Sequence, residues 1–277
     1  MSRLLARKAL AEFLGTGLLA ALVVGSGIMA QRLSTQDTGL ELLENSTATA
    51  LGLAALILMF APVSGAHFNP VVTLADFALG RRSRIGAGTG TDISTDAAST
   101  DTSTGTDART VAVFVPAQIA GGIGGAVLAN AMFALPAATA STHARTGAHL
   151  WLGEVVATAG LILLIFSLTR TGRGPLVPAA VGAYIGAAYW FTSSTSFANP
   201  AVTIARAFTD SFAGIAPGSV AGFVGAQLVG AAVGVGLVVV LYPVVLYPAP
   251  SSVVPDAAAD PGIEADPGIE HVAAARL

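Results

Sequence analysis

The sequence of 277 residues contains no cysteine, which excludes disulfides and thiolate metal sites. Charged residues are also scarce, at 10% of the chain against about 25% in an ordinary soluble domain. The four histidines, His67, His143, His149 and His271, are scattered and match no metal-ligand spacing. No pairing of a nucleophile with a base is apparent either, so we expect neither a metal site nor an enzyme.

Hydrophobic residues, in contrast, make up 53% of the chain and gather into six long apolar segments. An apolar helix of about 20 residues crosses the hydrocarbon core of a bilayer, so the segments predict an integral membrane protein. The predicted spans are residues 9–29, 47–62, 111–135, 150–169, 176–191 and 220–241.

Basic residues lie mostly on one side of the membrane if the six spans alternate in direction. On that side are Arg3, Arg7, Lys8, Arg81, Arg82, Arg84, Arg109, Arg170, Arg173 and Arg276. The other side has Arg32 and Arg145 in its connections. Because cytoplasmic loops are enriched in Lys and Arg, this bias predicts that both termini are cytoplasmic. We expect the protein to lie in the plasma membrane.

Two segments have a composition that cannot form a packed core. Residues 86–107 are nearly all Gly, Thr, Ser, Ala and Asp, which predicts a disordered cytoplasmic loop. Residues 242–277 contain a tandem repeat and predict a disordered cytoplasmic tail. The membrane domain is therefore expected to span residues 1–241.

The two halves of the chain repeat the same order of elements. Glu12 in the first span corresponds to Glu154 in the fourth, and Gln118 in the third corresponds to Gln227 in the sixth. Between them, residues 64–75 and 196–205 each contain an Asn-Pro pair followed by Val-Thr. Three spans per half give the repeats, about 9–135 and 150–241, opposite orientations in the bilayer. Inverted repeats place the functional site near the midplane.

Each Asn-Pro pair predicts the start of a short helix. Asparagine is a preferred N-cap, and proline fits the first helical turn. Residues 69–80 would form a helix of about 18 Å, which is too short to cross the membrane. Two such helix starts meeting at the midplane would oppose a cation, while the asparagine amides could donate to a passing oxygen. The predicted pore centre consists of Asn69, Pro70, Val71, Asn199, Pro200 and Ala201.

These motifs resemble those of the aquaporin, or major intrinsic protein, family. Residues 64–73 are similar to its first signature, with Val71 in place of the usual alanine, and residues 199–201 match the second. The resemblance implies an all-α membrane protein with six spans and two re-entrant half-helices, and a homotetramer with one pore per subunit. It also implies passive conduction without a cofactor. The implied partners are the lipid bilayer, small neutral solutes and water, and we expect no nucleic acid.

Supporting roles for three side chains also follow from the resemblance. Glu12 and Glu154 would accept hydrogen bonds from the loops beside the half-helices. The alternative is proton coupling, because carboxylates inside the membrane are commonly functional. His67 is expected to brace the first loop rather than to bind a metal.

The second signature departs from that of water-selective members, in which an arginine follows at once. Here Val202 occupies that position. Counting along the family pattern, the outer constriction would consist of Thr49, Ala187, Ser196 and Val202. This ring has neither charge nor aromatic bulk, so we expect a wide, relatively apolar constriction. Arg206, one helical turn further on, would restore a positive charge at the pore mouth; the alternative is that it pairs with Asp210 or reaches lipid headgroups.

The sequence therefore predicts a passive channel for glycerol-like polyols or metalloid hydroxides such as arsenite, with water also passing. A similarity to bacterial family members associated with arsenic resistance, in residues 189–199, supports this prediction. The alternatives are a water-selective channel or an ion-coupled secondary transporter. Uphill accumulation of a solute would distinguish the transporter from either channel.

Overall fold

The structure is a computed structural model that describes residues 1–87 and 106–243. Within these ranges the chain forms helices joined by loops, without a strand. Six helices, which we call the long helices, lie at the six predicted spans: α1 (Arg3–Leu33), α2 (Thr38–Ser64), α4 (Ala108–Met132), α5 (Ala148–Arg170), α6 (Val177–Phe191) and α8 (Pro217–Leu241). The others are α3 (Pro70–Ala87), α7 (Pro200–Ala205) and two 3₁₀ turns, η1 (Gly174–Leu176) and η2 (Arg206–Phe208). Most of the predicted loop 86–107 and nearly all of the predicted tail lie outside the described residues.

The six predicted spans correspond to the six long helices. In the described part of the chain, five of them (α1, α2, α4, α5 and α8) have the length and apolarity to cross a membrane. The sixth, α6, has 15 residues, but η1 extends it at its beginning by three more. Together they measure about 28 Å, close to the thickness of a hydrocarbon core.

Helix α2 begins nine residues before the predicted span at residue 47. Its polar first turns gave no apolar signal, but Asp37 caps the helix by accepting a hydrogen bond from the Leu40 amide at 3.0 Å. Asn45 is buried against α1, where its Nδ2 donates to the Val23 carbonyl at 2.9 Å. The cap at Asp37 and the burial of Asn45 against α1 therefore extend the helix beyond the apolar run.

Closely packed helix pairs hold each half together. A Cβ on Gly121 or Gly125 of α4 would overlap the backbone of α1 at Phe13 or Gly17. In the second half, a Cβ on Gly230 of α8 would lie 2.6 Å from the Val155 carbonyl oxygen of α5. Small residues at these crossings let the backbones approach, as is common between helices in membranes.

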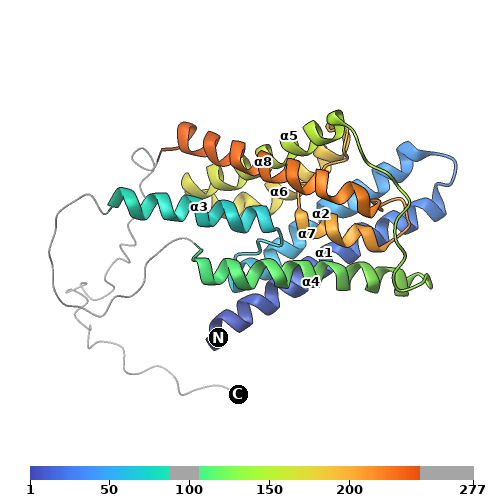
Figure 1. Ribbon diagram of the computed structural model, residues 1–277, viewed down its shortest axis with the longest axis horizontal. Coiled ribbons are helices and arrows are strands. Elements are labelled where there is room, and N and C mark those ends of the chain that lie inside the picture. Colours follow the sequence, from blue (N-terminus) through green and yellow to red (C-terminus); the bar gives the residue numbers. More distant parts are fainter. Residues whose placement is uncertain (88–105, 244–277) are drawn as a thin grey trace, which may run out of the picture.

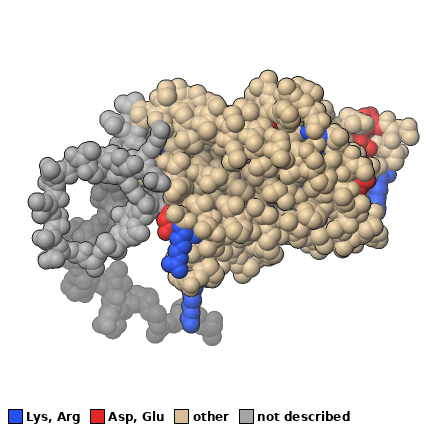
Figure 2. Space-filling model, viewed as in Figure 1, with Lys and Arg blue, Asp and Glu red and all other residues tan. Residues whose placement is uncertain are grey.

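The helices run lengthwise, with α3 and α7 between them (Figure 1). We call the end where α1 begins the near end and the end where α1 meets α2 the far end. Helix α3 runs from the centre toward the near end and α7 toward the far end, so that their starts face each other. In the view of Figure 2, Lys, Arg, Asp and Glu lie mainly toward the two ends, and uncharged residues cover the middle. This distribution suits a bilayer around the middle of the bundle.

Candidate pore and its lining

Two strained loops lead into the half-helices. Ala66 and Phe68 have φ angles of 51°, and Ser196 and Ala198 have φ angles of 49° and 48°. These residues lie three and one positions before the asparagine of each pair. The left-handed region costs a non-glycine residue about 1–2 kcal/mol, so the surroundings must hold both loops in place.

The carboxylate of Glu12 holds the first loop. It is fully buried and accepts hydrogen bonds from the backbone amides of His67 at 3.0 Å and Phe68 at 2.7 Å. The Ser64 hydroxyl donates a third bond at 2.6 Å. The donors thus turn inward to the carboxylate, and the strained conformation is stabilised.

Glu154 holds the second loop in the same manner. It is also fully buried and accepts hydrogen bonds from the amides of Phe197 and Ala198, both at 2.8 Å. Neither glutamate is among the residues that line the cavity described below.

Two glutamines connect these carboxylates to the half-helices, a role that the sequence repeat did not reveal by itself. Gln118 Nε2 donates to Glu12 at 2.8 Å and to the Thr73 hydroxyl at 3.0 Å. Gln227 Nε2 donates to Glu154 at 2.6 Å and to the Thr203 hydroxyl at 2.9 Å. Their matched positions in the two halves were the available signal.

The asparagine amides cross between the two halves. Asn69 Nδ2 donates to the Ala198 carbonyl and Asn199 Nδ2 to the Phe68 carbonyl, both at 2.8 Å. Each side-chain oxygen caps its own helix, that of Asn69 accepting from the Val71 amide at 3.1 Å. An amide nitrogen has two N–H donors, so each asparagine retains one beyond this cross-link.

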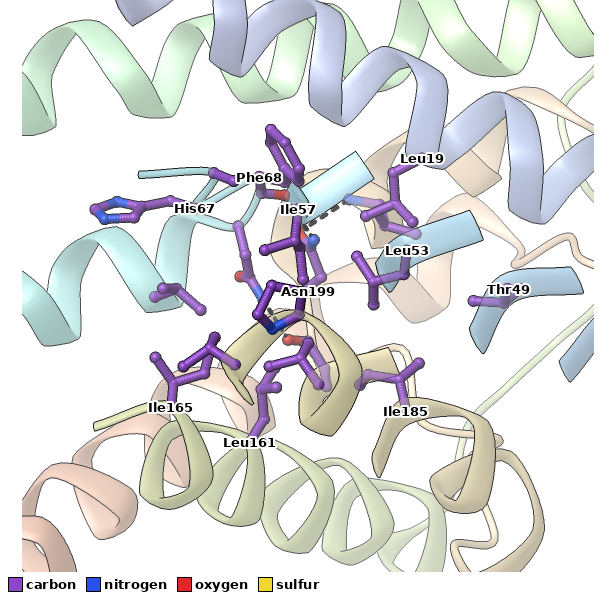
Figure 3. A pocket seen from close by; sticks show the side chains of 18 of the residues that line it. Leu19, Thr49, Leu53, Ile57, His67, Phe68, Leu161, Ile165, Ile185 and Asn199 are labelled. Carbon is purple, nitrogen blue, oxygen red and sulfur yellow. Dashed lines mark hydrogen bonds between the residues drawn. The ribbon is translucent and has the colours of Figure 1, made fainter. Parts of the chain in front are cut away.

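A cavity of about 330 Å³ runs past these asparagines. It follows α2 from Thr49 to Ala61 and α6 from Val177 to Tyr189, a distance of about 18 Å along each. Figure 3 shows Leu53, Ile57 and Leu161 around Asn199, with His67 on one side and Thr49 and Ile185 on the other. In the described part of the chain, α4 and α8 contribute no lining residue, so they serve as outer support for α1 and α5.

Three of the four predicted constriction residues, Thr49, Ser196 and Val202, line this cavity, but Ala187 does not. Ala187 is exposed on the outer side of α6, whereas Ile185 and Tyr189 face inward. Residues four apart share a helix face, and the residue midway between them points away, so counting back from Asn199 selected the opposite face.

With Ile185 and Tyr189 in place of Ala187, the lining near the predicted constriction has a different chemical character from the one expected. The Tyr189 hydroxyl lies 3.2 Å from the Thr49 hydroxyl oxygen, within hydrogen-bonding distance. The ring therefore contains an aromatic side chain, contrary to the sequence-based expectation. Counting back along a regular helix from the end of α6 would have placed Ile185 and Tyr189 on the inward face.

Arg206 lines the far end of the cavity and is 2% exposed. Its guanidinium carbon lies 3.4 Å from the centre of the Phe197 ring, and its Nε donates to the Ala213 carbonyl. Asp210 is engaged elsewhere, since it accepts a hydrogen bond from the Thr142 amide at 2.9 Å. The alternative expectation that Arg206 pairs with Asp210 is therefore wrong.

His67 lines the cavity toward the near end, with its Nδ1 3.1 Å from the Thr73 hydroxyl oxygen and its ring against Phe114. The residues that the structure describes contain no cluster of three or more His, Cys, Asp or Glu side chains that could hold a metal.

Long apolar helices, opposed half-helices and a cavity between them define a membrane channel formed by two inverted halves. The model of the family described as Major intrinsic protein matches residues 1–87. The chain is 48% identical over 227 residues to the aquaglyceroporin AqpS of Rhizobium meliloti, covering 82% of this chain and 86% of that protein. It is 31% identical over 203 residues to the glycerol uptake facilitator protein of Escherichia coli, covering 64% and 63%.

The fold matches the X-ray structure of the aquaglyceroporin from Plasmodium falciparum with a TM-score of 0.57, at 19% identity. The match covers 84% of this chain and 95% of that one. The chain therefore belongs to the major intrinsic protein family, as its motifs predicted. It is an integral membrane protein and a passive channel rather than an enzyme.

Proposed function

We propose that this channel conducts small polyols and metalloid hydroxides, such as glycerol and arsenite, together with water. The observation that carries the proposal is the two-sided lining of the cavity. Leu53, Ile57 and Leu161 form apolar surface, while Asn69 and Asn199 supply amide donors. A polyol has both an alkyl face and hydroxyl groups, so it matches apolar walls with a few polar groups.

Val202 supports passage of solutes larger than water. It lies in the first turn of α7, and its side chain lines the cavity where a longer arginine would narrow it. Uncharged As(OH)₃ is about the size of glycerol and likewise presents hydroxyl groups, so one pore chemistry suits both.

The opposed half-helices disfavour cations. Asn69 and Asn199 lie at the positive ends of the dipoles of α3 and α7, where a cation is repelled. A neutral solute is not subject to this repulsion, and its oxygen atoms can accept hydrogen bonds from the remaining N–H groups of the two asparagine amides.

Ion-coupled transport, the other class considered, has little support. The carboxylates of Glu12 and Glu154 are occupied by backbone and glutamine donors and lie away from the cavity. A proton-coupling carboxylate would need access to the solute pathway. Asp76 does line the cavity, but its carboxylate accepts two hydrogen bonds from Thr106 near one mouth.

We further propose that the near end is cytoplasmic, that the membrane is the plasma membrane, and that the channel is a homotetramer with a pore in each subunit. The basic residues Arg3, Arg7 and Lys8 at the near end support this orientation. Exposed apolar side chains such as Leu51 and Leu58 suit contact with lipid or with another subunit. The channel domain would comprise residues 1–241, with halves at about 9–135 and 150–241.

Flux measurements in liposomes test the function. The full chain is expected to accelerate downhill entry of water, glycerol and arsenite, without uphill accumulation in a proton or sodium gradient. The variant Val202→Trp should reduce glycerol entry to that of empty liposomes, because the indole would fill the cavity. Val240→Trp is the matched control, since Val240 is 75% exposed on α8. Water entry without glycerol or arsenite entry would contradict the proposal and favour the water-selective alternative.

A further inference from the structure

Arg206 has hydrogen-bonding capacity that the protein does not use. A guanidinium carries five N–H donors, and among the described residues it uses the one on Nε. The remaining four, on the two terminal nitrogens, have no hydrogen-bond partner in this part of the chain, although the side chain is 2% exposed and lines the cavity. Because Arg206 lines the cavity, these donors are available to an oxygen atom of a solute inside it.

The guanidinium is held in a fixed position. It lies against the Phe197 ring, which also contacts the Arg145 guanidinium at 5.2 Å. Arg145 is anchored in turn, because its Nε donates to the Gly214 carbonyl at 2.9 Å. A ring in contact with two cations, and packed against Phe223 at 5.0 Å between ring centres, leaves Arg206 little freedom to leave the cavity.

An unused acceptor lies in the same wall. The Ser196 hydroxyl oxygen is buried, lines the cavity and has no hydrogen-bond partner among the described residues. Ser196 directly precedes Phe197, so it belongs to the same strained loop that carries the ring under Arg206. The far end of the cavity thus offers charged donors together with a hydroxyl that can donate or accept.

We propose that Arg206 determines specificity at the far end of the pore. Its terminal N–H groups bind an oxygen of the entering hydroxylated solute, Ser196 provides a second contact, and the positive charge excludes cations. This inference rests on the proposed function and specifies how the solute is recognised. Arg206 follows Val202 by four residues, just after α7 ends at Ala205, and both side chains line the cavity.

The test separates charge from hydrogen bonding. The variants Arg206→Gln and Arg206→Lys are compared with the wild type in liposomes for proton conductance and for the ratio of glycerol to water permeability. Arg32→Gln is the matched control. Arg32 is also at the far end, donates to the Phe133 carbonyl at 2.6 Å and contacts that ring at 5.0 Å, but it does not line the cavity.

Arg206→Gln is expected to raise proton conductance about tenfold, because a positive charge near the path is lost. It should also lower the glycerol-to-water ratio several-fold, since charged donors bind an oxygen more strongly than neutral ones. Arg206→Lys should keep protons excluded but lower the ratio, because it keeps the charge and loses the planar fork. Arg32→Gln should change neither value.

If Arg206→Gln has the proton conductance and the glycerol-to-water permeability ratio of the wild type, the inference about Arg206 is overturned. The proposed function still stands in that case, provided that the wild type conducts glycerol. Absence of glycerol flux in the wild type would contradict the proposed function instead. Should Arg206→Gln fail to fold, judged by its elution as a single species, Arg206→Lys decides, and an unchanged ratio in that variant overturns the inference.

Discussion

The two half-helices differ most at the seventh residue after their asparagines. That residue is Asp76 in α3 and Arg206 after α7, and both line the cavity, one toward each end. Asp76 accepts two hydrogen bonds from Thr106, from its amide at 2.9 Å and its hydroxyl at 2.5 Å. Arg206 stacks on Phe197. The two mouths therefore have opposite formal charges, and a solute meets different chemistry at each.

The centre of the molecule shows the reverse, because the halves are nearly identical there. Both asparagines donate across the midplane at 2.8 Å, and both loops have left-handed residues three and one positions before the asparagine. The comparison teaches that the repeat retains its chemistry where the halves hold each other and differs where solutes enter.

The largest expected effect comes from removing the carboxylates that support this symmetric centre. Glu12→Gln and Glu154→Gln each place an NH₂ group against backbone donors in a strained loop, at a cost of about 3 kcal/mol or more. Glu12 accepts four hydrogen bonds and Glu154 three, so Glu12→Gln should be the more destabilising. Thermal unfolding in detergent measures both.

Gln227→Met serves as a comparison, because it removes one donor to Glu154 and keeps the carboxylate that accepts from the loop. Equal stability of Glu12→Gln and the wild type would show that the loops hold their conformation without the carboxylate. A larger loss for Glu154→Gln than for Glu12→Gln would contradict the ranking by hydrogen bonds.

The next effect concerns the helix crossings. Gly125→Ala should destabilise the protein by about 1–3 kcal/mol, because the new Cβ would meet the α1 backbone and force the helices apart. Gly234→Ala, at the matching crossing of α5 and α8, should cost less, since its Cβ would lie 2.8 Å from the Ala159 carbonyl oxygen. Gly124→Ala is the control, because a Cβ there meets nothing within 4 Å.

Unfolding temperatures of the three glycine variants sharpen the comparison between halves. If Gly234→Ala costs more than Gly125→Ala, the second half is the more rigid one. Because alanine has a higher helix propensity than glycine, a destabilised Gly124→Ala variant would attribute the losses to lipid contact rather than to the crossings.

Much of the fold could be predicted from the sequence because its signals are local and duplicated. Apolar runs indicated the six long helices, and the caps in the Asn-Pro pairs indicated the starts of α3 and α7. The start of α2 was missed, since hydropathy reports apolar side chains, whereas Asn45 is polar and is buried against α1.

The site was harder to predict because it depends on how each helix is rotated about its axis and on contacts between side chains that are distant in the sequence. The error at Ala187 is a matter of helical phase, which a count through a loop does not preserve. The contact of Arg206 with Phe197 joins residues on a short helix and a strained loop, and its bond to the Ala213 carbonyl depends on a later turn. Such contacts arise from the tertiary fold.

The smallest effect is expected at the exposed Asp210, whose contact with Thr142 resembles that of Asp76 with Thr106. Thr142 donates to Asp210 through its amide at 2.9 Å and its hydroxyl at 3.0 Å, as Thr106 does to Asp76. These bonds favour the carboxylate and lower the pKa of Asp210 below its ordinary value of 3.8. The contribution to stability is therefore complete at neutral pH and is lost as the pH falls below 3.8 through the lowered pKa.

Because Asp210 is partly exposed, Asp210→Asn should cost less than about 1 kcal/mol at pH 7. As the pH falls through the lowered pKa, the wild type and the variant should approach each other in unfolding temperature, since protonation removes in the wild type what the substitution removes at every pH. Thr142→Val, which loses the hydroxyl donor and keeps the amide, should fall between them at pH 7. Parallel profiles of unfolding temperature against pH for the wild type and Asp210→Asn would show that the hydrogen bonds do not stabilise this carboxylate in the folded protein. The two Thr–Asp contacts would then resemble each other in geometry without a shared contribution to stability.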